Sequence, residues 1–119
     1  MGRDVIFYRT ETGKCPVEEF LESLKPKEAQ KVLWVLKLIE ELNKIPSQYF
    51  KKLAGTEEIW ECRVRTHSKA YRVFSFFLDG DTLVLTNGYS KKSQKTDHRQ
   101  IRRTESYRRD YLARKGGRL

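Results

Sequence analysis

The sequence predicts an α+β fold with an antiparallel sheet, two helices before the sheet and a basic helix after it. Two observations carry this prediction. Segments with helical spacing lie towards the two ends of the chain, and consecutive β-prone segments lie between them. The 119 residues suit one compact domain, which we expect to span residues 1–115, with residues 116–119 as a frayed end.

The N-terminal part of the chain predicts a strand followed by two helices. Residues 4–9 are short, apolar and β-prone, and residues 17–24 place apolar side chains at helical spacing. Residues 27–44 carry the longest helical signal, which contains no Gly or Pro and lies between Pro26 and Pro46. The order strand, helix, helix therefore opens the fold.

One stretch of this longest helix is apolar on more than one face. Residues 32–36 (VLWVL) are all hydrophobic, and Trp34 stands in the middle. We expect the helix to pack on two sides within the domain. The alternative is an apolar surface that the helix offers to a partner.

The middle of the chain predicts four consecutive antiparallel strands. The segment EIWECRVR alternates apolar and polar side chains, as a strand with one buried face does. The segment AYRVFSFFL is a continuous aromatic and β-branched run, typical of a central strand covered on both faces. A DGD turn follows it and predicts a hairpin. The four strands are expected within residues 48–55, 58–65, 70–78 and 82–89.

The last predicted element is a basic helix over residues 96–115. Thr96 is a suitable N-cap, and Asp97 suits the positive start of a helix. A narrow apolar stripe is marked by Ile101, Thr104, Tyr107 or Arg108, and Tyr111 or Leu112. The rest of the helix is largely Arg and Lys, so we expect one face on the sheet and a basic face in solvent.

Positive charge is segregated along the chain. Residues 1–50 hold eight Lys/Arg and eight Asp/Glu, whereas residues 51–119 hold seventeen Lys/Arg and eight Asp/Glu, which accounts for the whole net charge of +9. Such asymmetry predicts a polyanion partner on one side of the molecule. The alternative is a basic domain whose charge serves solubility only.

Cysteine spacing and hydropathy limit the classes of protein to which the chain can belong. Cys15 and Cys62 could form one disulfide, but no feature requires it, and a reducing cytoplasm is the expected environment. The sequence contains no CxxC or Cys/His cluster and no carboxylates at metal-ligand spacing, so we expect no metal and no cofactor. No long apolar segment predicts a signal peptide or a membrane span.

The strand expected at residues 58–65 carries a charged face. Glu61, Arg63 and Arg65 alternate along it, so their side chains are about 7 Å apart. This separation is comparable with that of successive phosphates in an extended nucleic-acid strand. Glu61 could pair with an Arg or act as a general base. The alternative is an exposed ladder of cross-strand salt bridges.

Arg72 interrupts an otherwise apolar and aromatic strand. A charge at such a position is costly unless it is paired or lies at a cleft. Two interpretations stand: a buried ion pair with Glu61, or an arginine that binds phosphate and stabilises a pentacoordinate transition state.

The segment after the last strand, YSKK, adds further candidates. Tyr89 could supply a phenol for acid–base chemistry or base stacking, and Lys91 and Lys92 could neutralise developing phosphate charge. His67, in a predicted turn between strands, and His98, in the first turn of the last helix, are possible acid–base groups or ordinary exposed histidines.

These motifs resemble those of RelE/HigB-like toxins of type II toxin–antitoxin systems. The carrying segments are GTEEIWECRVR, YRVFSFF and TLVLTNGYSKKSQKT, followed by a basic helix. They are most similar to the phage-derived HigB-like branch, with its W-E-x-R, R-x-x-x-F and G-F-x-K-K-x-Q-K-T-P pattern. Here Tyr89 stands where Phe is commoner, and KTDHR replaces the commoner KTPKR.

The resemblance implies a microbial-ribonuclease-like α+β fold with helices packed on a curved, mainly antiparallel sheet. It implies a cytoplasmic mRNA interferase, an endoribonuclease that needs no metal and cuts mRNA on the ribosome, so inhibiting translation. The 2′-OH of the RNA attacks the adjacent phosphate and leaves a 2′,3′-cyclic phosphate. The implied protein partner is an antitoxin with a helix-turn-helix domain, and no membrane is involved.

On this basis the candidate residues fall into three groups. The first is catalytic: Arg72, Arg65, Lys92, Tyr89 and Glu61. The second binds RNA phosphates: Arg63, Lys91, Lys95, Arg99 and Arg102. The third, His67 and His98, comprises possible acid–base groups, and the general base stays open among Glu61, Tyr89 and these two histidines. Alternative functions are a ParE-like toxin that poisons DNA gyrase and a non-catalytic nucleic-acid-binding phage accessory protein.

Overall fold

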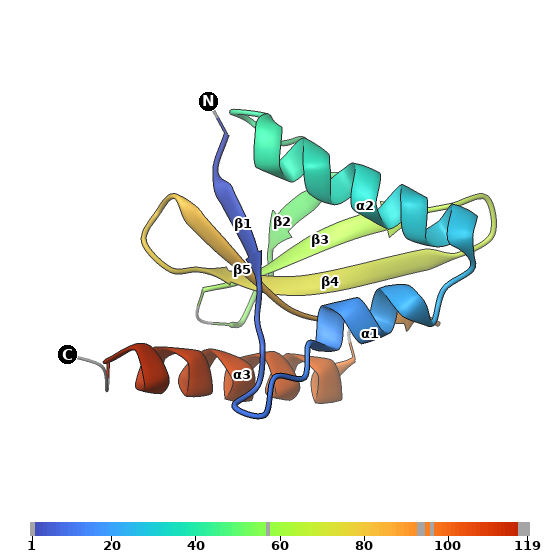
Figure 1. The fold of residues 1–119 in the computed structure, drawn as a ribbon. Coiled ribbons are helices and arrows are strands. Elements are labelled where there is room, and N and C mark those ends of the chain that lie inside the picture. The colour runs from blue at the N-terminus through green and yellow to red at the C-terminus, as the bar shows by residue number, and fades with distance from the viewer. Residues whose placement is uncertain (1, 57, 93–94, 96, 117–119) are drawn as a thin grey trace.

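The computed structural model describes residues 2–56, 58–92, 95 and 97–116 (Figure 1). All eight predicted elements are present in the predicted order, with ends that differ by a few residues. They are β1 (Asp4–Phe7), α1 (Pro16–Glu22), α2 (Pro26–Glu41), β2 (Phe50–Lys52), β3 (Ile59–Arg65), β4 (Ala70–Phe77), β5 (Thr82–Lys91) and α3 (His98–Gly116).

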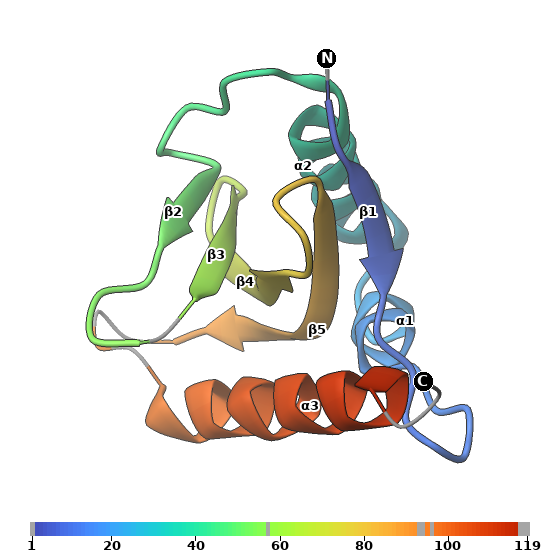
Figure 2. The same cartoon turned by 90° about the vertical axis from the view of Figure 1, so that its left-hand side faces the viewer.

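The strands form one open, mixed sheet in the order β1-β5-β4-β3-β2. From β2 to β5 each strand is antiparallel to the next, which confirms the predicted meander, whereas β1 joins the edge of β5 in parallel. A bulge at Thr86 interrupts the register of β4 and β5 between Phe74 and Ser75. The sheet is curved, and β5 bends strongly along its length (Figure 2).

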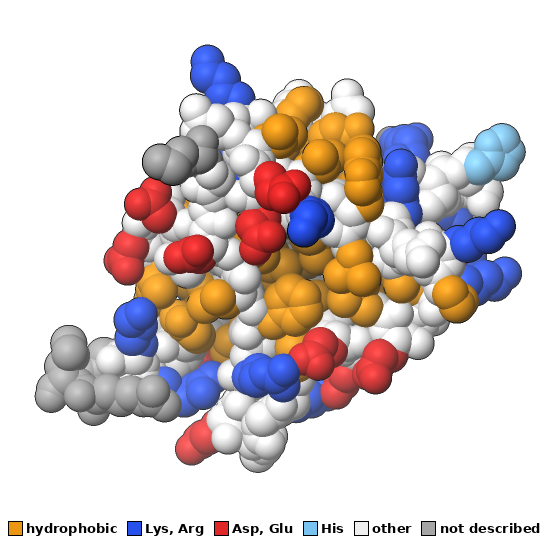
Figure 3. Space-filling view, turned by 45° about the horizontal axis from the view of Figure 1, so that its top comes forward, with side chains coloured by type: hydrophobic (Ala, Val, Ile, Leu, Met, Phe, Trp, Pro, Cys, Tyr) orange, Lys and Arg blue, Asp and Glu red, His pale blue; other side chains and the backbone are white. Residues whose placement is uncertain are grey.

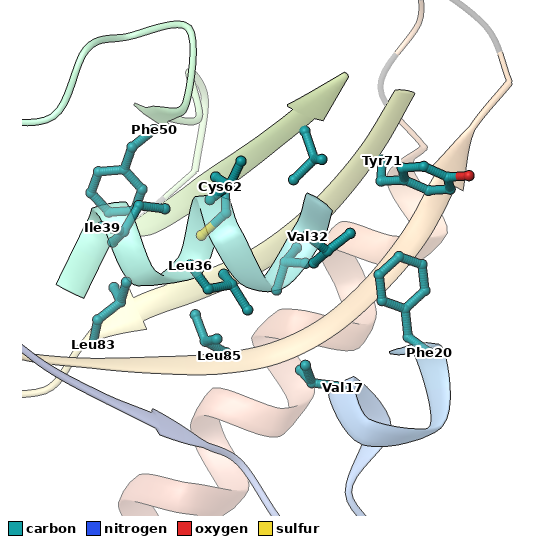
Figure 4. Close-up of a cluster of buried hydrophobic side chains, with 13 residues drawn as sticks. Val17, Phe20, Val32, Leu36, Ile39, Phe50, Cys62, Tyr71, Leu83 and Leu85 are labelled. Carbon is teal, nitrogen blue, oxygen red and sulfur yellow. The ribbon is translucent and has the colours of Figure 1, made fainter. Parts of the chain in front are cut away.

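The first face of the sheet holds the main core beneath α1 and α2. Pro26 starts α2, and the Glu28 carboxylate accepts a hydrogen bond from the Lys25 amide at 3.2 Å, which satisfies one free donor at the helix start. The core residues come from both helices and four strands, and burial of each large one stabilises the fold by about 1.5–3 kcal/mol (Figure 4). They include Val17, Phe20, Val32, Leu36, Ile39, Phe50, Cys62, Tyr71, Leu83 and Leu85.

The second face of the sheet is covered by α3, which lies on the opposite side from α2 (Figures 1 and 2). Tyr8, at the end of β1, stacks on Tyr107 with ring centroids 4.7 Å apart, and Phe76 meets Tyr111 edge-on at 5.9 Å. The predicted apolar stripe of the last helix is therefore the side that packs on the sheet. This cover extends over β5 and β4 but not over the charged side of β3.

A buried polar network joins α3 to β5. The Thr104 hydroxyl donates to Asn87 Oδ1 at 2.7 Å, and Asn87 Nδ2 donates to Gln100 Oε1 at 3.0 Å. Thr86, the bulge residue, donates to the Phe74 carbonyl at 3.0 Å. Thr86, Asn87 and Thr104 are buried, and each finds a partner, so the network fixes how α3 sits on the sheet.

The expectation that α2 packs on two sides is wrong. Leu33 is 48% exposed and Trp34 is 47% exposed, because no element covers the outer side of the helix. Trp34 meets Tyr49 edge-on, and the Lys31 ammonium lies 4.7 Å from its ring centroid. Hydrophobic side chains accordingly gather on the α2 face, whereas Lys and Arg crowd one margin of the view (Figure 3).

Three further expectations concern single features of the chain. Cys15 and Cys62 are both buried and free. Within the described ranges, no helix combines the length and the apolar character that crossing a bilayer requires. Thr96, the expected N-cap, and residues 117–119 of the expected frayed end lie outside the described residues.

Candidate active site

The register of three strands gathers the predicted charged residues into rows. Arg63 of β3 lies directly opposite Arg72 of β4, which lies directly opposite Tyr89 of β5. In the next row, Arg65 and Lys91 flank Ala70. Directly opposed residues share a face of a sheet, so all five project from the second face, on the part that α3 leaves open.

Glu61 binds both central arginines. Its Oε1 lies 3.3 Å from Arg63 Nε, and its Oε2 lies 3.4 Å from Arg72 Nε. Arg72 also donates from Nη1 to the Tyr71 carbonyl at 3.1 Å. Only 6% of Glu61 and 3% of Arg72 are exposed, so each charge depends on the other for compensation.

The contact between Glu61 and Arg72 is an ion pair rather than an aligned hydrogen bond. Arg72 Nε is buried, and among the described residues it has no acceptor in hydrogen-bond geometry. Both arginines present their Nε atoms to the carboxylate, which leaves the Nη groups of Arg63 without an acceptor in the part of the chain that the structure describes. The carboxylate therefore orients the two guanidinium groups without neutralising the cluster as a whole.

A surface hollow of about 790 Å³ opens over these rows. The shortness of Ala70 leaves room between the cations on either side of it. The hollow is walled by β3, β4, the turn between them and the end of β5, and none of its described lining residues is a carboxylate. Its cationic lining residues are Arg63, Arg65, Lys69, Arg72, Lys91 and Lys92, and His67 lies in the same wall.

A second hollow of about 380 Å³ lies on the other side of the end of β5. It is lined by Tyr89, Lys91 and Lys92 from the strand end and by residues at the start of α3. Asp97 belongs to this lining, and its carboxylate accepts hydrogen bonds from the Arg99 amide and side chain. The two hollows share Lys91 and Lys92, so a chain-like ligand could pass from one to the other.

The environment of the cluster shifts the pKa values of three of its side chains. Burial lowers the pKa of Arg72, and the nearby Arg63 adds to this effect against the opposing pull of Glu61. Burial lowers the pKa of Lys91, and so does the charge of Arg72. Burial raises the pKa of Tyr89, so its phenol stays neutral, and its hydroxyl has no hydrogen-bond partner among the residues described.

The structure thus brings most of the predicted site residues together. Six of them share the open part of the second face: Glu61, Arg63, Arg65, Arg72, Tyr89 and Lys91. Lys92, directly after β5, lines both hollows. His67 lines the larger hollow, and Lys95 and Arg99 line the smaller one. His98 and Arg102 are exposed on α3 and line neither of these two hollows.

Sequence reasoning missed the contribution of the turn between β3 and β4. Lys69 lines the larger hollow, and its ammonium lies 3.4 Å from Glu28 Oε2, so α2 is tied to the site wall. The sequence did contain a signal for this turn, because the turn directly joins two arginine-bearing strands. Sequence reasoning also missed Asn87, whose role in the buried network depends on the bulge at Thr86.

Metal binding has no evident donor set in this region. Across the described ranges, His, Cys, Asp and Glu nowhere form a group of three or more that could hold a metal ion. The donors that do converge, guanidinium and ammonium groups, bind anions.

Comparison with known proteins gives one match. The sequence profile of the family described as phage derived protein Gp49-like (DUF891) matches residues 19–109, which is most of the chain and includes every residue of both hollows. No curated protein matches the chain.

Proposed function

The chain belongs to the phage-derived Gp49-like family, within the RelE/HigB-like toxin superfamily, and from this membership we propose that it is an mRNA-cleaving toxin of a type II toxin–antitoxin system. The superfamily is associated with endoribonuclease activity and with an antitoxin partner. We assign the chain to the HigB-like branch, because its segments WECR, YRVFSFF and KKSQKT fit the pattern of that branch.

One observation carries the proposal. Six cationic side chains line a single hollow, and its described lining contains no carboxylate. Among the described residues, two carboxylates pair with these cations: Glu61 with Arg63 and Arg72, and Glu28 with Lys69. Arrays of this kind bind successive phosphates of a nucleic-acid strand. The exposed strand end and the neighbouring hollow would let a single strand continue past the cluster towards α3.

The proposed chemistry is an internal transfer within the RNA. The 2′-oxygen attacks the adjacent phosphorus, the bond from phosphorus to O2′ forms, and the bond from phosphorus to O5′ breaks. The products are a 2′,3′-cyclic phosphate and a 5′-hydroxyl. Negative charge grows on the phosphoryl oxygens in the transition state, and Arg72, Arg63 and Lys91 are the groups that would stabilise it.

Proton transfer needs a base for the 2′-hydroxyl and an acid for the leaving oxygen. We assign the base to His67, because its imidazole lines the larger hollow, whereas both oxygens of Glu61 face arginines and His98 lies outside the lining. We assign the acid to Lys91, since its lowered pKa makes it a better proton donor than an ordinary lysine. Tyr89, as a neutral phenol, would donate a hydrogen bond to the substrate.

We further propose that the mRNA is cut on the ribosome, in the cytoplasm, and that a helix-turn-helix antitoxin neutralises the protein. The net charge of +9 supports binding to a ribonucleoprotein surface.

The test is induced expression of the protein followed by mapping of 5′ ends of transcripts, with and without active translation. Arg65→Ala and Lys91→Ala should each reduce cleavage by about 10²–10³-fold. Neither residue has an ion-pair partner among the described residues, so neither change should unfold the protein. Arg109→Ala removes one exposed cation from α3, outside both hollows, and serves as the charge-matched control.

Three outcomes would overturn the proposal. Growth arrest with intact transcripts and broken DNA would indicate a gyrase poison. RNA binding without cleavage would indicate a non-catalytic binder. Equal losses in Arg65→Ala and Arg109→Ala would show that total charge, and not the hollow, is what matters.

A further inference from the structure

The second half of β5 has an open edge. β1 pairs only with the first part of β5, and the last bond of that ladder runs from the Tyr8 amide to the Leu85 carbonyl at 2.9 Å. Beyond this point β5 continues to Lys91 and pairs only with β4. The chain after Tyr8 turns away into the loop before α1, so no strand lies beside the final residues of β5.

The register shows which backbone groups face this edge. The Leu78 amide donates to the Thr82 carbonyl, so even-numbered residues of β4 turn their backbone groups towards β5. Arg72 is opposite Tyr89, which therefore exchanges bonds with it. Backbone direction alternates along a strand, so the N–H and C=O groups of Gly88 and Ser90 point away from β4, to the open edge.

A groove of about 400 Å³ lies over this edge, between α1 and α3. Phe20 of α1 and Ser23, directly after α1, form one wall. Arg103 and Tyr107 of α3 form the other, and Gly88 also lines the groove. The Phe20 ring packs so closely on Gly88 that a Cβ there would collide with it. This contact holds the edge in place, while Gly88 itself stays half-buried and Ser90 is exposed.

The charges around the groove favour an acidic occupant. Arg103 is exposed, and across the described residues its guanidinium has no ion pair or hydrogen bond. Lys14, at the α1 side, lies 3.6 Å from Glu19, so that pair is nearly neutral. Lys91 and Lys92 follow directly after Ser90. An occupant that runs along the edge would therefore pass three cations that no carboxylate of the groove balances.

We propose that an extended, carboxylate-bearing segment of a protein partner adds to the sheet as a strand along Gly88 and Ser90. Its backbone would supply the alternating donors and acceptors that the edge lacks, and an acidic side chain would bind Arg103. The added strand would lie about 4.8 Å from β5, beside Tyr89 and Lys91. The added strand would then block access of RNA to the proposed active site, a consequence that rests on the proposed function.

The first test uses a synthetic probe. The probe is a capped peptide of alternating Glu and Val, about eight residues long. A control peptide of the same sequence, called the twin below, carries N-methyl groups on every second amide. Hydrogen exchange of the full chain is measured by NMR. At a free concentration of about nine times Kd, the peptide should slow exchange at Gly88 and Ser90 about tenfold, and the twin should not. Tyr89 should be unchanged, because its amide already faces β4.

Two variants sharpen this test. Ser90→Pro removes one edge amide without removing a bond to β4, and it should weaken binding of the peptide. Arg103→Glu should weaken binding of the Glu peptide and strengthen binding of a matched peptide with Lys in place of Glu. Because the N-methylated twin needs no change in the protein, the test remains valid even if Ser90→Pro does not fold.

The proposal is overturned if millimolar peptide leaves Gly88 and Ser90 unprotected, or if the twin protects them equally. It is also overturned if only a single-stranded oligonucleotide protects these amides, since the groove would then be part of the RNA surface. Protection by the peptide in a protein that cleaves no RNA would refute the proposed function alone. Cleavage without protection would refute strand addition alone.

Discussion

The second face of the sheet has a part covered by α3 and an open part, and the polar side chains of the two parts are compensated in different ways. Under α3, the buried polar groups of Thr86, Asn87 and Thr104 are uncharged, and each finds a partner within the protein. In the open part, most of the polar groups are charged, and the cations outnumber the two described carboxylates, Glu61 and Glu28, that pair with them. These polar groups of the covered part have their hydrogen-bond partners within the protein, whereas the open part carries excess positive charge that can bind an anion. This difference is the physical reason to place the function there.

The sharpest way to break the comparison is to remove Arg72. Arg72→Ala leaves the Glu61 carboxylate buried with Arg63 alone, and we expect a loss of about 3–5 kcal/mol in the free energy of unfolding, measured by urea titration. The double variant Glu61→Ala/Arg72→Ala should recover part of that loss, because no uncompensated charge remains. Arg65→Ala is the matched control, since Arg65 is exposed and should change stability little. An Arg72→Ala protein as stable as the parent would refute the buried pair.

The next largest effect tests the assignment of the base. His67→Gln should reduce the rate of RNA cleavage by about 100-fold, because the variant side chain cannot accept the proton of the 2′-hydroxyl. His98→Gln is the control, because His98 is exposed outside the lining of both hollows. If His98→Gln loses activity and His67→Gln keeps it, the base lies at the start of α3 instead.

The covered part of the face is tested by Thr104→Val. The change keeps the shape of the side chain but leaves Asn87 Oδ1 without its 2.7 Å donor, so we expect a loss of about 1–3 kcal/mol in unfolding free energy. Cleavage per folded molecule should stay unchanged, because the network does not line the larger hollow. Ser106→Ala, on the exposed side of the same helix, should alter neither property.

The smallest effect concerns alkaline pH. Burial, together with the Asp110 carboxylate that accepts a 2.5 Å hydrogen bond from the phenol, raises the pKa of Tyr8 to about 12. The folded state thus retains a proton that the unfolded chain loses above its ordinary pKa of about 10. The stability from this group is full below pH 10 and is lost as pH rises to about 12.

Tyr8→Phe should therefore reduce the fall in unfolding free energy between those pH values by about 1–2 kcal/mol, measured by denaturant titration at a series of pH values. A fall of the same size in the parent and the variant would show that Tyr8 does not titrate differently on folding.

The sequence allowed the order of elements to be predicted because each one has a clear period and a clear stop. The alternation in EIWECRVR placed Cys62 and Val64 in the core and the charges on the other face. Alternation identifies a face, however, and not what covers it. Glu61 is therefore buried between two arginines where an exposed ladder was an open alternative, and Trp34 is exposed where two-sided packing was expected.

Features that depend on long-range strand pairing could not be predicted from the sequence. The parallel addition of β1 to β5 joins residues that are far apart in the chain, and no local pattern specifies it. The bulge at Thr86 decides that Asn87 faces α3 and that Gly88 faces Phe20, yet TLVLTNGY shows no break in its period. The open edge of β5 follows from both features together, so it became visible only in the structure.

The most direct test of the central claim is the chemistry of the RNA ends made by the purified protein on translating ribosomes with a metal chelator that leaves the ribosomes intact. We predict 5′-hydroxyl ends and 2′,3′-cyclic phosphates, unchanged by the chelator and lost in Lys91→Ala. Ends with a 3′-hydroxyl and a 5′-phosphate, or cleavage that the chelator abolishes, would contradict the account of the cationic hollow as a metal-independent active site.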